Sequence, residues 1–562
     1  MRLLSRFRFL LRFLSALRYF FSMAPAIKER EKKEKAEKLA AQKRAAEAAS
    51  STSTPKRRVG KLPASGAATP VRRMGASIDQ GALDMAGLNL QETDEPVKDE
   101  PPPKMTLAKE KVLEEARQAL NGERAALSLV VIGHVDAGKS TLMGRLLYET
   151  GRIVEKERQA NARESDRQGK GSFAWAWSMD ATSEERARGI TMDVAQNSLA
   201  TPHRAITILD APGHRDFVPN MISGAAQADC ALLVVDAGPG EFEAGFAKGG
   251  QTREHVLLVR SLGVAQAVVA VNKLDAASWD QDRYNEIVET LKPFMQQSGF
   301  APQRTHFVPV AAPTGVNLVT RDIKEAEPLK KWYDGPTLVD LLDKLQPPAR
   351  DLSAPLRFPV SNVFKATGSS SGVTGRVLSG VVQVGERLRV LPGDETAVVR
   401  AIEGDDDNLP WAAAGANVTL YLTAIDPIHL NIGSVLCPPT APVPLASTFT
   451  ARIIVFDIVV PILAGSAVEI FFGAHDLPAS ISKLTATLDR TSGKTIKANP
   501  RVLTKGANAE VQITLRGTGT GTAARPTLVP LEPFSVNKEM GRVLVRRGGE
   551  TIAAGIVLDI LS

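Results

Sequence analysis

A chain of 562 residues has room for three or four domains with buried cores. Its 43% hydrophobic content excludes a wholly disordered protein, and its two cysteines exclude a disulfide framework. The net charge of +7 is uneven: residues 1–78 hold 19 Lys and Arg against 5 Asp and Glu, and the remainder holds 50 against 57. The body can therefore bind nucleic acid only through local basic patches or a partner protein.

Residues 1–104 are predicted to be a disordered, basic, low-complexity extension, because Lys/Glu/Ala, Ser/Thr/Pro and acidic Pro-rich runs follow one another. Residues 1–22 carry five Arg and no acid. This pattern is typical of a mitochondrial transit peptide, but it also fits an upstream start codon with the working start at Met23. No segment is apolar for long enough to span a bilayer, so we expect no stable membrane association.

Residues 105–349 are predicted to form an α/β domain opened by a helix over 106–120. From Leu127 an apolar strand run leads through a Gly-bounded loop into a helix. Strand runs alternating with helical stretches are typical of a mostly parallel sheet covered by helices on both faces. The further strand runs lie at 205–210, 231–237 and 267–272.

Two all-β regions are predicted after this domain. Residues 353–443 and 446–562 consist of short β-branched runs separated by Gly turns. This texture favours two successive antiparallel β-barrel domains. Cys230 lies in an apolar strand run of the first domain and is interpreted as a reduced core residue, which fits a reducing compartment.

The sequence GHVDAGKS follows a predicted strand and opens a helix, which is the context of a phosphate-binding loop. Its glycines let backbone N–H groups approach phosphates, Lys139 places a charge on the outer phosphates, and the Ser140 hydroxyl can bind Mg²⁺. The residues expected at the nucleotide are Gly133, His134, Val135, Asp136, Ala137, Gly138, Lys139, Ser140 and Thr141.

The sequence NKLD ends a later strand and indicates which base is bound. The Asp275 carboxylate can accept from the ring N–H and the exocyclic amine of guanine, which adenine does not offer. Lys273 can lie over the base, and Asn272 can tie this loop to the phosphate loop. Asn272, Lys273, Leu274 and Asp275 are therefore predicted to bind the guanine of GTP or GDP.

The sequence DAPGH ends another strand and supplies Asp210, Ala211, Pro212, Gly213 and His214. Asp210 is placed to hold Mg²⁺ through water, and Gly213 can offer its N–H to a γ-phosphate at close range. His214 follows immediately and is predicted to be the catalytic residue, which orients the attacking water.

Residues 155–195 lie between these motifs, where a γ-phosphate sensor is expected. Thr191 is predicted as a ligand of Mg²⁺ and the γ-phosphate, and Ile190 is expected to pair with Val135 as an apolar gate before His214. The charged run 184–188 is expected to stay solvated, or to reach the ribosome or a partner. The two Trp of the segment should pack it down in one nucleotide state.

Taken together, GHVDAGKST, ERARGITMD, DAPGHRDFVPNMI, GEFEAGFAKGGQTREH and NKLD resemble the translational GTPases related to elongation factor one-alpha. The resemblance covers residues 105–562 and implies a GTPase domain followed by two β-barrels. Within that superfamily, GHVDAGKSTLMGRLLYETG and GSFAWAWSMDATSEERARGITMDV are similar to the HBS family of ribosome-rescue GTPases. The resemblance to the HBS family implies a cytoplasmic monomer that pairs with a Pelota-type protein and binds ribosomes during no-go and non-stop mRNA surveillance.

One element departs from the family pattern, which has Ser-Gly or Ser-Ala after the last strand of the guanine site. Here VPVAAPTGVN offers Ala311 and Ala312 without the hydroxyl, so backbone N–H groups are expected to serve the guanine oxygen. Two alternatives stay open at this stage. In the first, the cargo is a class I release factor or aminoacyl-tRNA. In the second, the chain is a nucleotide-gated binding scaffold whose hydrolysis is incidental.

Replacing the base-reading carboxylate tests the guanine assignment. Asp275→Asn should shift preference from GTP toward xanthosine triphosphate, because the new amide matches the xanthine edge. Competition binding of the two triphosphates measures the shift, and unchanged selectivity would remove Asp275 from the base site.

Overall fold

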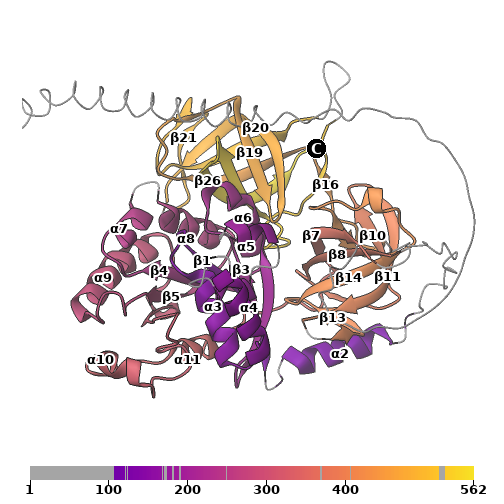
Figure 1. Ribbon diagram of the computed structural model, residues 1–562. Coiled ribbons are helices and arrows are strands. Elements are labelled where there is room, and N and C mark those ends of the chain that lie inside the picture. Colours follow the sequence, from indigo (N-terminus) through magenta and orange to yellow (C-terminus); the bar gives the residue numbers. More distant parts are fainter. Residues whose placement is uncertain are drawn as a thin grey trace, which may run out of the picture. The chain divides into compact units, whose positions relative to one another are not determined.

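The computed structural model describes residues 105, 107–120, 122, 124–167, 169, 174–179, 183–188, 191–247, 250–366, 370–405, 407–490, 492–517 and 526–562. The predicted extension over residues 1–104, the first residue of the predicted opening helix, Thr106, and the expected gate residue Ile190 lie outside the described residues. Within the described part, the predicted α/β domain followed by two β-barrels is confirmed (Figure 1).

The first domain is built on a six-stranded sheet with the order β2-β3-β1-β4-β5-β6. β2 runs antiparallel to β3, and the other neighbours are parallel. The central strands are continuous apolar runs, because a parallel sheet is covered on both faces. The strands are β1 (Ala125–Gly133), β2 (Ala195–Ala200), β3 (Arg204–Asp210), β4 (Cys230–Asp236), β5 (Gln266–Asn272) and β6 (Thr305–Pro309).

Alternate side chains of β1 pack in two separate hydrophobic cores, one on each face of the sheet. Val130 and Ile132 pack in the core with α6 (Val218–Ala226), α7 (Glu241–Phe246), α8 (Gln251–Ser261) and α9 (Gln281–Gln297). Leu129 and Val131 pack in the core with α3 (Lys139–Glu149) and α11 (Leu338–Asp343). The sheet is therefore sandwiched between two helical layers (Figure 1).

Shorter elements complete the domain. The predicted opening helix is observed as α2 (Lys109–Leu120). The remaining helices of the domain are α4 (Glu155–Arg167), α5 (Ser183–Arg188) and α10 (Glu327–Lys330), with 3₁₀ turns η2 (Ala176–Ser178), η3 (Arg215–Phe217), η4 (Pro302–Arg304) and η5 (Lys324–Ala326). None of the helices in the described ranges combines the length and apolar character that a membrane crossing requires.

The second domain is a closed antiparallel barrel, because β10, the first strand of the order, also pairs with β11 near its other end. Its six barrel strands are β7 (Phe358–Lys365), β8 (Ser371–Arg376), β10 (Arg387–Leu391), β11 (Glu395–Glu403), β14 (Asn417–Thr423) and β15 (Val435–Cys437). Small additions are β9 (Val381–Gln383), β12 (Asn408–Leu409), β13 (Trp411–Ala413) and η6 (Pro427–His429).

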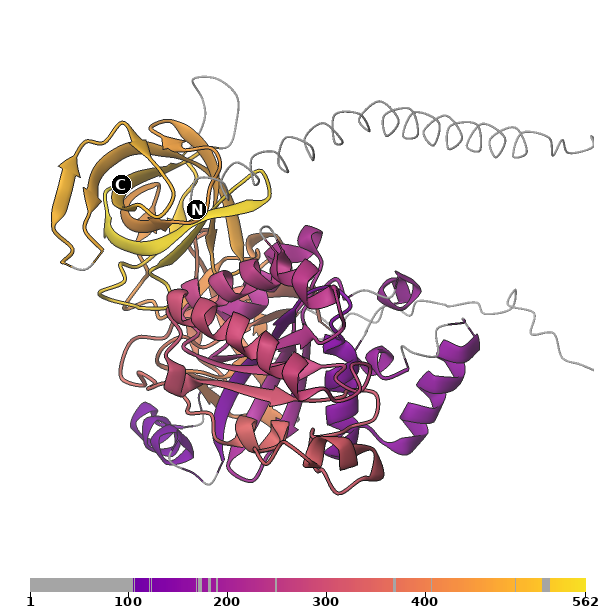
Figure 2. The ribbon, with the colours of Figure 1, turned by 90° about the vertical axis from the view of Figure 1, so that its left-hand side faces the viewer.

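The third domain closes in the same way through β19 and β20, and Figure 2 shows its strands curving into a ring. Inward residues alternate with outward ones along β23, as a barrel wall requires. The barrel strands are β17 (Thr448–Val455), β19 (Ser466–Phe472), β20 (His475–Leu488), β23 (Asn508–Leu515), β25 (Arg542–Arg547) and β26 (Glu550–Ile560). Short strands are β16 (Leu445–Ala446), β18 (Ile462–Leu463), β21 (Thr495–Ala498), β22 (Val502–Leu503) and β24 (Val529–Pro530).

A buried carboxylate joins the sheet domain to the first barrel. Asp229, directly before β4, lies 2.6 Å from Arg350 and also pairs with Arg376 of β8. Burial alone would raise the pKa of Asp229, but the two guanidiniums and the Ser128 N–H together hold it below its usual range. All three side chains are at most 6% exposed, so burying each charge is tolerable only because the opposite charge lies beside it.

Removing this charge should weaken the fold. Asp229→Asn leaves two buried guanidiniums without a counter-charge, which should cost about 3–5 kcal/mol of unfolding free energy. Urea unfolding at neutral pH measures the loss, and Asp559→Asn at an exposed position of β26 is the control.

The same variant should also alter the response to acid. The folded pKa of Asp229 is depressed, so its contribution is present above the unfolded pKa and is lost as the pH falls through the folded value. Asp229→Asn should therefore lose less stability on acidification than the parent chain. Equal acid sensitivity in both proteins would contradict this role.

Candidate nucleotide-hydrolysis site

Three sequence motifs meet at one edge of the sheet. The loop 133–140 follows β1, the loop 210–214 follows β3, and the loop 272–275 follows β5. Carboxyl ends of parallel strands share an edge, and ligands of open α/β sheets bind there. The fold thus brings the predicted phosphate, water-orienting and base elements together.

The Lys139 ammonium lies inside the phosphate loop. It donates to the carbonyls of Gly133 and His134 at 3.2 and 3.0 Å. Burial lowers the pKa of Lys139, while Asp210 and Asp136 oppose that effect. A Cβ on Gly213 would lie 2.3 Å from the Lys139 Nζ, so a larger residue there would displace the Lys139 ammonium. The loop therefore holds a desolvated cation where an anion can approach.

Three side-chain oxygens converge next to this cation. The Ser140 hydroxyl donates to Asp210 Oδ2 at 2.9 Å and lies 3.0 Å from the Thr191 hydroxyl. Asp210 Oδ1 is buried and has no hydrogen-bond partner among the described residues. Burial raises the pKa of Asp210 to about 6, although Lys139 and Ser140 oppose it. A buried carboxylate beside two hydroxyls is a donor set that fits a hard divalent cation.

His214 lies at the rim of the same site. Its Nδ1 accepts from the Asp216 N–H at 3.2 Å, so in the neutral ring the proton is on Nε2. Its side chain is 42% exposed. The ring is thus oriented by its own loop while Nε2 remains able to donate to water. Val135, the expected partner of Ile190, donates its N–H to Gln251 Oε1 at 3.3 Å.

Asn272 joins three loops. Its Nδ2 donates to the Ala137 carbonyl at 2.9 Å, and its Oδ1 accepts from the Ala312 N–H at 3.0 Å. The Ala311 N–H donates to the Val316 carbonyl at 3.3 Å. Both N–H groups expected to serve the guanine oxygen are thus used within the protein, and the next residue, Pro313, has no N–H.

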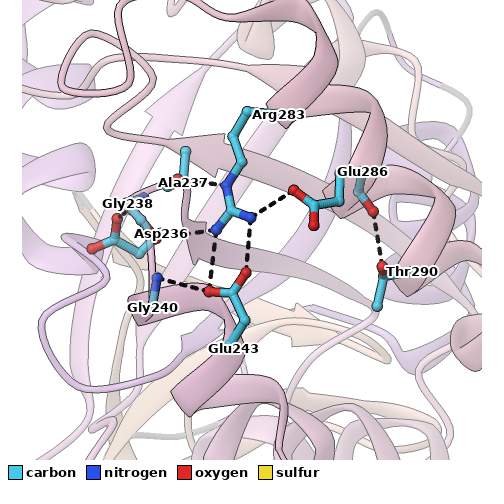
Figure 3. Close-up of polar contacts among 8 residues, drawn as sticks. All are labelled: Asp236, Ala237, Gly238, Gly240, Glu243, Arg283, Glu286 and Thr290. Atoms are coloured by element: carbon cyan, nitrogen blue, oxygen red, sulfur yellow. Dashed lines mark hydrogen bonds and ion pairs between the residues drawn. The ribbon is translucent and has the colours of Figure 1, made fainter.

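Lys273 is held in place by contacts that the sequence did not reveal. Asp236 pairs with Lys273, and Arg283 binds the loop after Asp236; we call this arrangement the Arg283 brace. The Lys273 Nζ lies 2.7 Å from Asp236 at the end of β4, while Leu274 is buried and Asp275 is exposed. Figure 3 shows Arg283 of α9 reaching over the loop that follows Asp236. Arg283 donates to the carbonyls of Ala237 and Gly238 at 3.0 and 3.2 Å.

Two carboxylates hold Arg283 from the other side. Glu243 and Glu286 both lie 2.8 Å from its Nη1, and the Arg283 hydrogen bond lowers the pKa of Glu243 (Figure 3). Glu243 also accepts from the Gly240 N–H at 2.9 Å. Arg283 therefore fixes the loop whose Asp236 carboxylate positions Lys273.

The segment 155–195 packs down through its tryptophans. Trp177 is fully buried, and the Trp175 ring lies 5.2 Å from Tyr148 and 4.7 Å from the Arg145 guanidinium. A Cβ on Gly144 of α3 would lie 2.0 Å from the Trp175 carbonyl, so glycine is required at this contact. The segment is thus seated on the helix that follows the phosphate loop.

The prediction of a solvated run over 184–188 is wrong at Glu185. This side chain is 4% exposed, and its carboxylate accepts from the Met192 and Asp193 N–H groups at 2.9 and 3.3 Å. An irregular segment offers backbone donors that need acceptors, and a nearby carboxylate satisfies two of them. Glu184 and Arg188 do stay exposed, as a pair 2.7 Å apart.

Comparison with known proteins identifies this arrangement. Residues 124–348 match the Elongation factor Tu GTP binding domain, 373–437 match Elongation factor Tu domain 2, and 448–558 match the GTP-eEF1A C-terminal domain-like family. Protein HBS1 of Drosophila melanogaster is 43% identical over 458 residues, which cover 81% of this chain and 67% of that protein. The chain belongs to the HBS1 family of elongation factor-like GTPases.

Two further matches are to an elongation factor in sequence and to a GTPase-like domain in fold. Elongation factor 1-alpha of Ignicoccus hospitalis is 40% identical over 78% of this chain and 97% of its own length. The Ski7 GTPase-like domain of S. cerevisiae, bound to GDP and inorganic phosphate, shares the fold with a TM-score of 0.64 at 18% identity, covering 79% of this chain and 99% of that one. As an HBS1-type translational GTPase, the chain binds GTP and GDP and hydrolyses GTP.

The Arg283 brace should support nucleotide binding without taking part in hydrolysis. Arg283→Met should weaken GDP and GTP affinity equally, by about 3–10-fold, because Lys273 loses its fixed support. Fluorescent-nucleotide titration measures both affinities, and Arg304→Met at an exposed position is the control. A slower hydrolysis of bound GTP would show that the brace acts on more than binding.

Proposed function

We propose that this GTPase carries a Pelota-type protein to the empty or stalled A site of cytoplasmic ribosomes, in no-go and non-stop mRNA surveillance. The observation that carries the proposal is the 43% identity with Protein HBS1 of Drosophila melanogaster across 81% of the chain. The factor is a monomer that forms a heterodimer with its cargo. Its contact with the ribosome uses local surfaces, because residues 79–562 hold 50 Lys and Arg against 57 Asp and Glu.

Ser140, Thr191 and Asp210 are the residues that would hold Mg²⁺, which neutralises charge developing on the phosphates when bound. Three contacts support that assignment: Asp210 Oδ1 is buried without a described partner, the Ser140 hydroxyl lies 2.9 Å from Asp210 Oδ2, and the Ser140 and Thr191 hydroxyls lie 3.0 Å apart. Lys139 stabilises the same charge from the phosphate loop. The Thr191 hydroxyl lies at the end of the segment that seats on α3, so ordering of that segment accompanies GTP binding.

His214 orients the attacking water. Its Nδ1 is engaged by the Asp216 N–H, which leaves Nε2–H to donate to a water at the rim. The exposed position allows the ribosome to change the ring's orientation and so to control hydrolysis. After hydrolysis the Thr191 segment releases and the factor leaves its cargo.

Identification of the cargo tests the function. The purified chain is loaded with a non-hydrolysable GTP analogue, incubated with cell extract and recovered, with GDP as the control. Recovery of a Pelota-type protein in the GTP state, without charged tRNA or a class I release factor, supports the proposal. Recovery of either of those other cargoes contradicts it and leaves the fold and GTPase activity unaffected.

Replacing the histidine tests its role. His214→Ala should bind GTP normally but lose about 10²-fold or more of ribosome-stimulated hydrolysis, because no group orients the water. Single-turnover GTP hydrolysis with and without ribosomes measures this, and His429→Ala at an exposed position of the second domain is the control. Full stimulated turnover in His214→Ala would refute the assignment.

A further inference from the structure

The residues after Thr191 lie directly against α6. The Asn220 amide of this helix donates to the Met192 carbonyl at 2.8 Å and to Asp193 Oδ1 at 2.9 Å. One turn later, a Cβ on Gly224 would lie 3.1 Å from the Val194 side chain, so Val194 packs directly against the helix backbone there. One face of α6 thus holds three consecutive residues of the segment.

Met192 is held at both of its main-chain polar groups. Its N–H donates to the buried Glu185 carboxylate at 2.9 Å, while its carbonyl accepts from Asn220. Thr191 is the preceding residue, and its hydroxyl lies 3.0 Å from that of Ser140. The position of the Thr191 hydroxyl therefore depends on a neighbour whose backbone is fixed from two sides.

The same helix carries the loop of His214. The turn η3 begins directly after His214, its Phe217 N–H bonds the His214 carbonyl at 3.0 Å, and α6 begins at the next residue. A movement of the first turns of α6 therefore moves the His214 loop with them. Asn220 is the side chain through which this helix holds the segment that ends at Thr191.

We propose that Asn220 is a positioning residue that couples the two halves of the hydrolysis site. Its amide makes the placement of His214 depend on the closed position of the Thr191 segment, so that hydrolysis proceeds only when that segment is seated. Two segments joined in this way bias each other reciprocally. The inference rests on the proposed roles of Thr191 and His214.

A positioning role for Asn220 should change GTP binding and hydrolysis selectively, whereas a mere packing role should change GDP and GTP binding equally. The Thr191 segment responds to a γ-phosphate, which GDP lacks, so loss of the link should affect GTP selectively. Asn220→Ala removes two hydrogen bonds and should leave GDP affinity within about twofold of the parent chain. It should weaken binding of a non-hydrolysable GTP analogue by about 3–10-fold and slow single-turnover hydrolysis by at least as much.

Two further variants make the test decisive. Asn285→Ala on α9 removes an exposed Asn and should change nothing. Asp193→Ala removes one of the two acceptors of Asn220 at an exposed position, and should give a smaller shift of the same kind. Asp193→Ala therefore tests the link even where Asn220→Ala is poorly folded.

The outcomes separate this inference from the proposed function. A selective loss for the GTP analogue accompanied by slower single-turnover hydrolysis, in Asn220→Ala or in Asp193→Ala, supports the link, and unchanged hydrolysis in both variants overturns it. An equal loss for GDP and the analogue, or no loss in either folded variant, overturns it. The cargo recovered from extract and the ribosome response of His214→Ala do not enter this comparison, so those proposals fail or stand separately.

Discussion

The register of the parallel strands is the constraint on which the site depends. Val131 of β1 lies opposite Asp210 of β3, and Asp236 of β4 lies opposite Asn272 of β5. A shift by one residue would turn every side chain of a strand to the opposite face. In the observed register, the polar residues that follow the apolar runs arrive at the same edge.

The polar groups at this edge are costly to bury and are paired accordingly. Lys139 donates to two backbone carbonyls, and Asp210 accepts from the Ser140 hydroxyl. The Asn272 amide both donates to and accepts from neighbouring loops. Asp210 keeps one oxygen without a described partner. Such an incomplete set favours a ligand that supplies the missing partner, which is why the site is poised to bind phosphates with a cation.

Helix α6 connects this edge to the first barrel. Asn220 near its start holds the Thr191 segment, and the backbone carbonyl of Gln227 after its end accepts from Arg376 of β8. Asp229, two residues further on, is enclosed by Arg376 and Arg350. The start of α6 is thus held by an amide contact at the nucleotide site, and the residues after its end are held by arginine contacts at the barrel.

Several residues of the site could not be found from the sequence. Glu185 lies in a charged run that reads as solvated, because only the fold brings the backbone donors of Met192 and Asp193 to it. Arg283 lies on a helix with no motif, and the carbonyls that it binds are more than forty residues away in the chain. The engaged N–H groups of Ala311 and Ala312 likewise appear only once the loops are folded.

The sequence by itself determined the fold class, the phosphate loop, the NKLD element and the family, because these depend on local spacing and on apolar periodicity. The tertiary structure alone decided which carboxylate holds the segment after Thr191, which arginine braces Lys273 and how α6 is joined to its neighbours. Those contacts are made by backbone carbonyls and N–H groups, which every residue carries. No residue pattern distinguishes them until the chain has brought them within hydrogen-bonding distance.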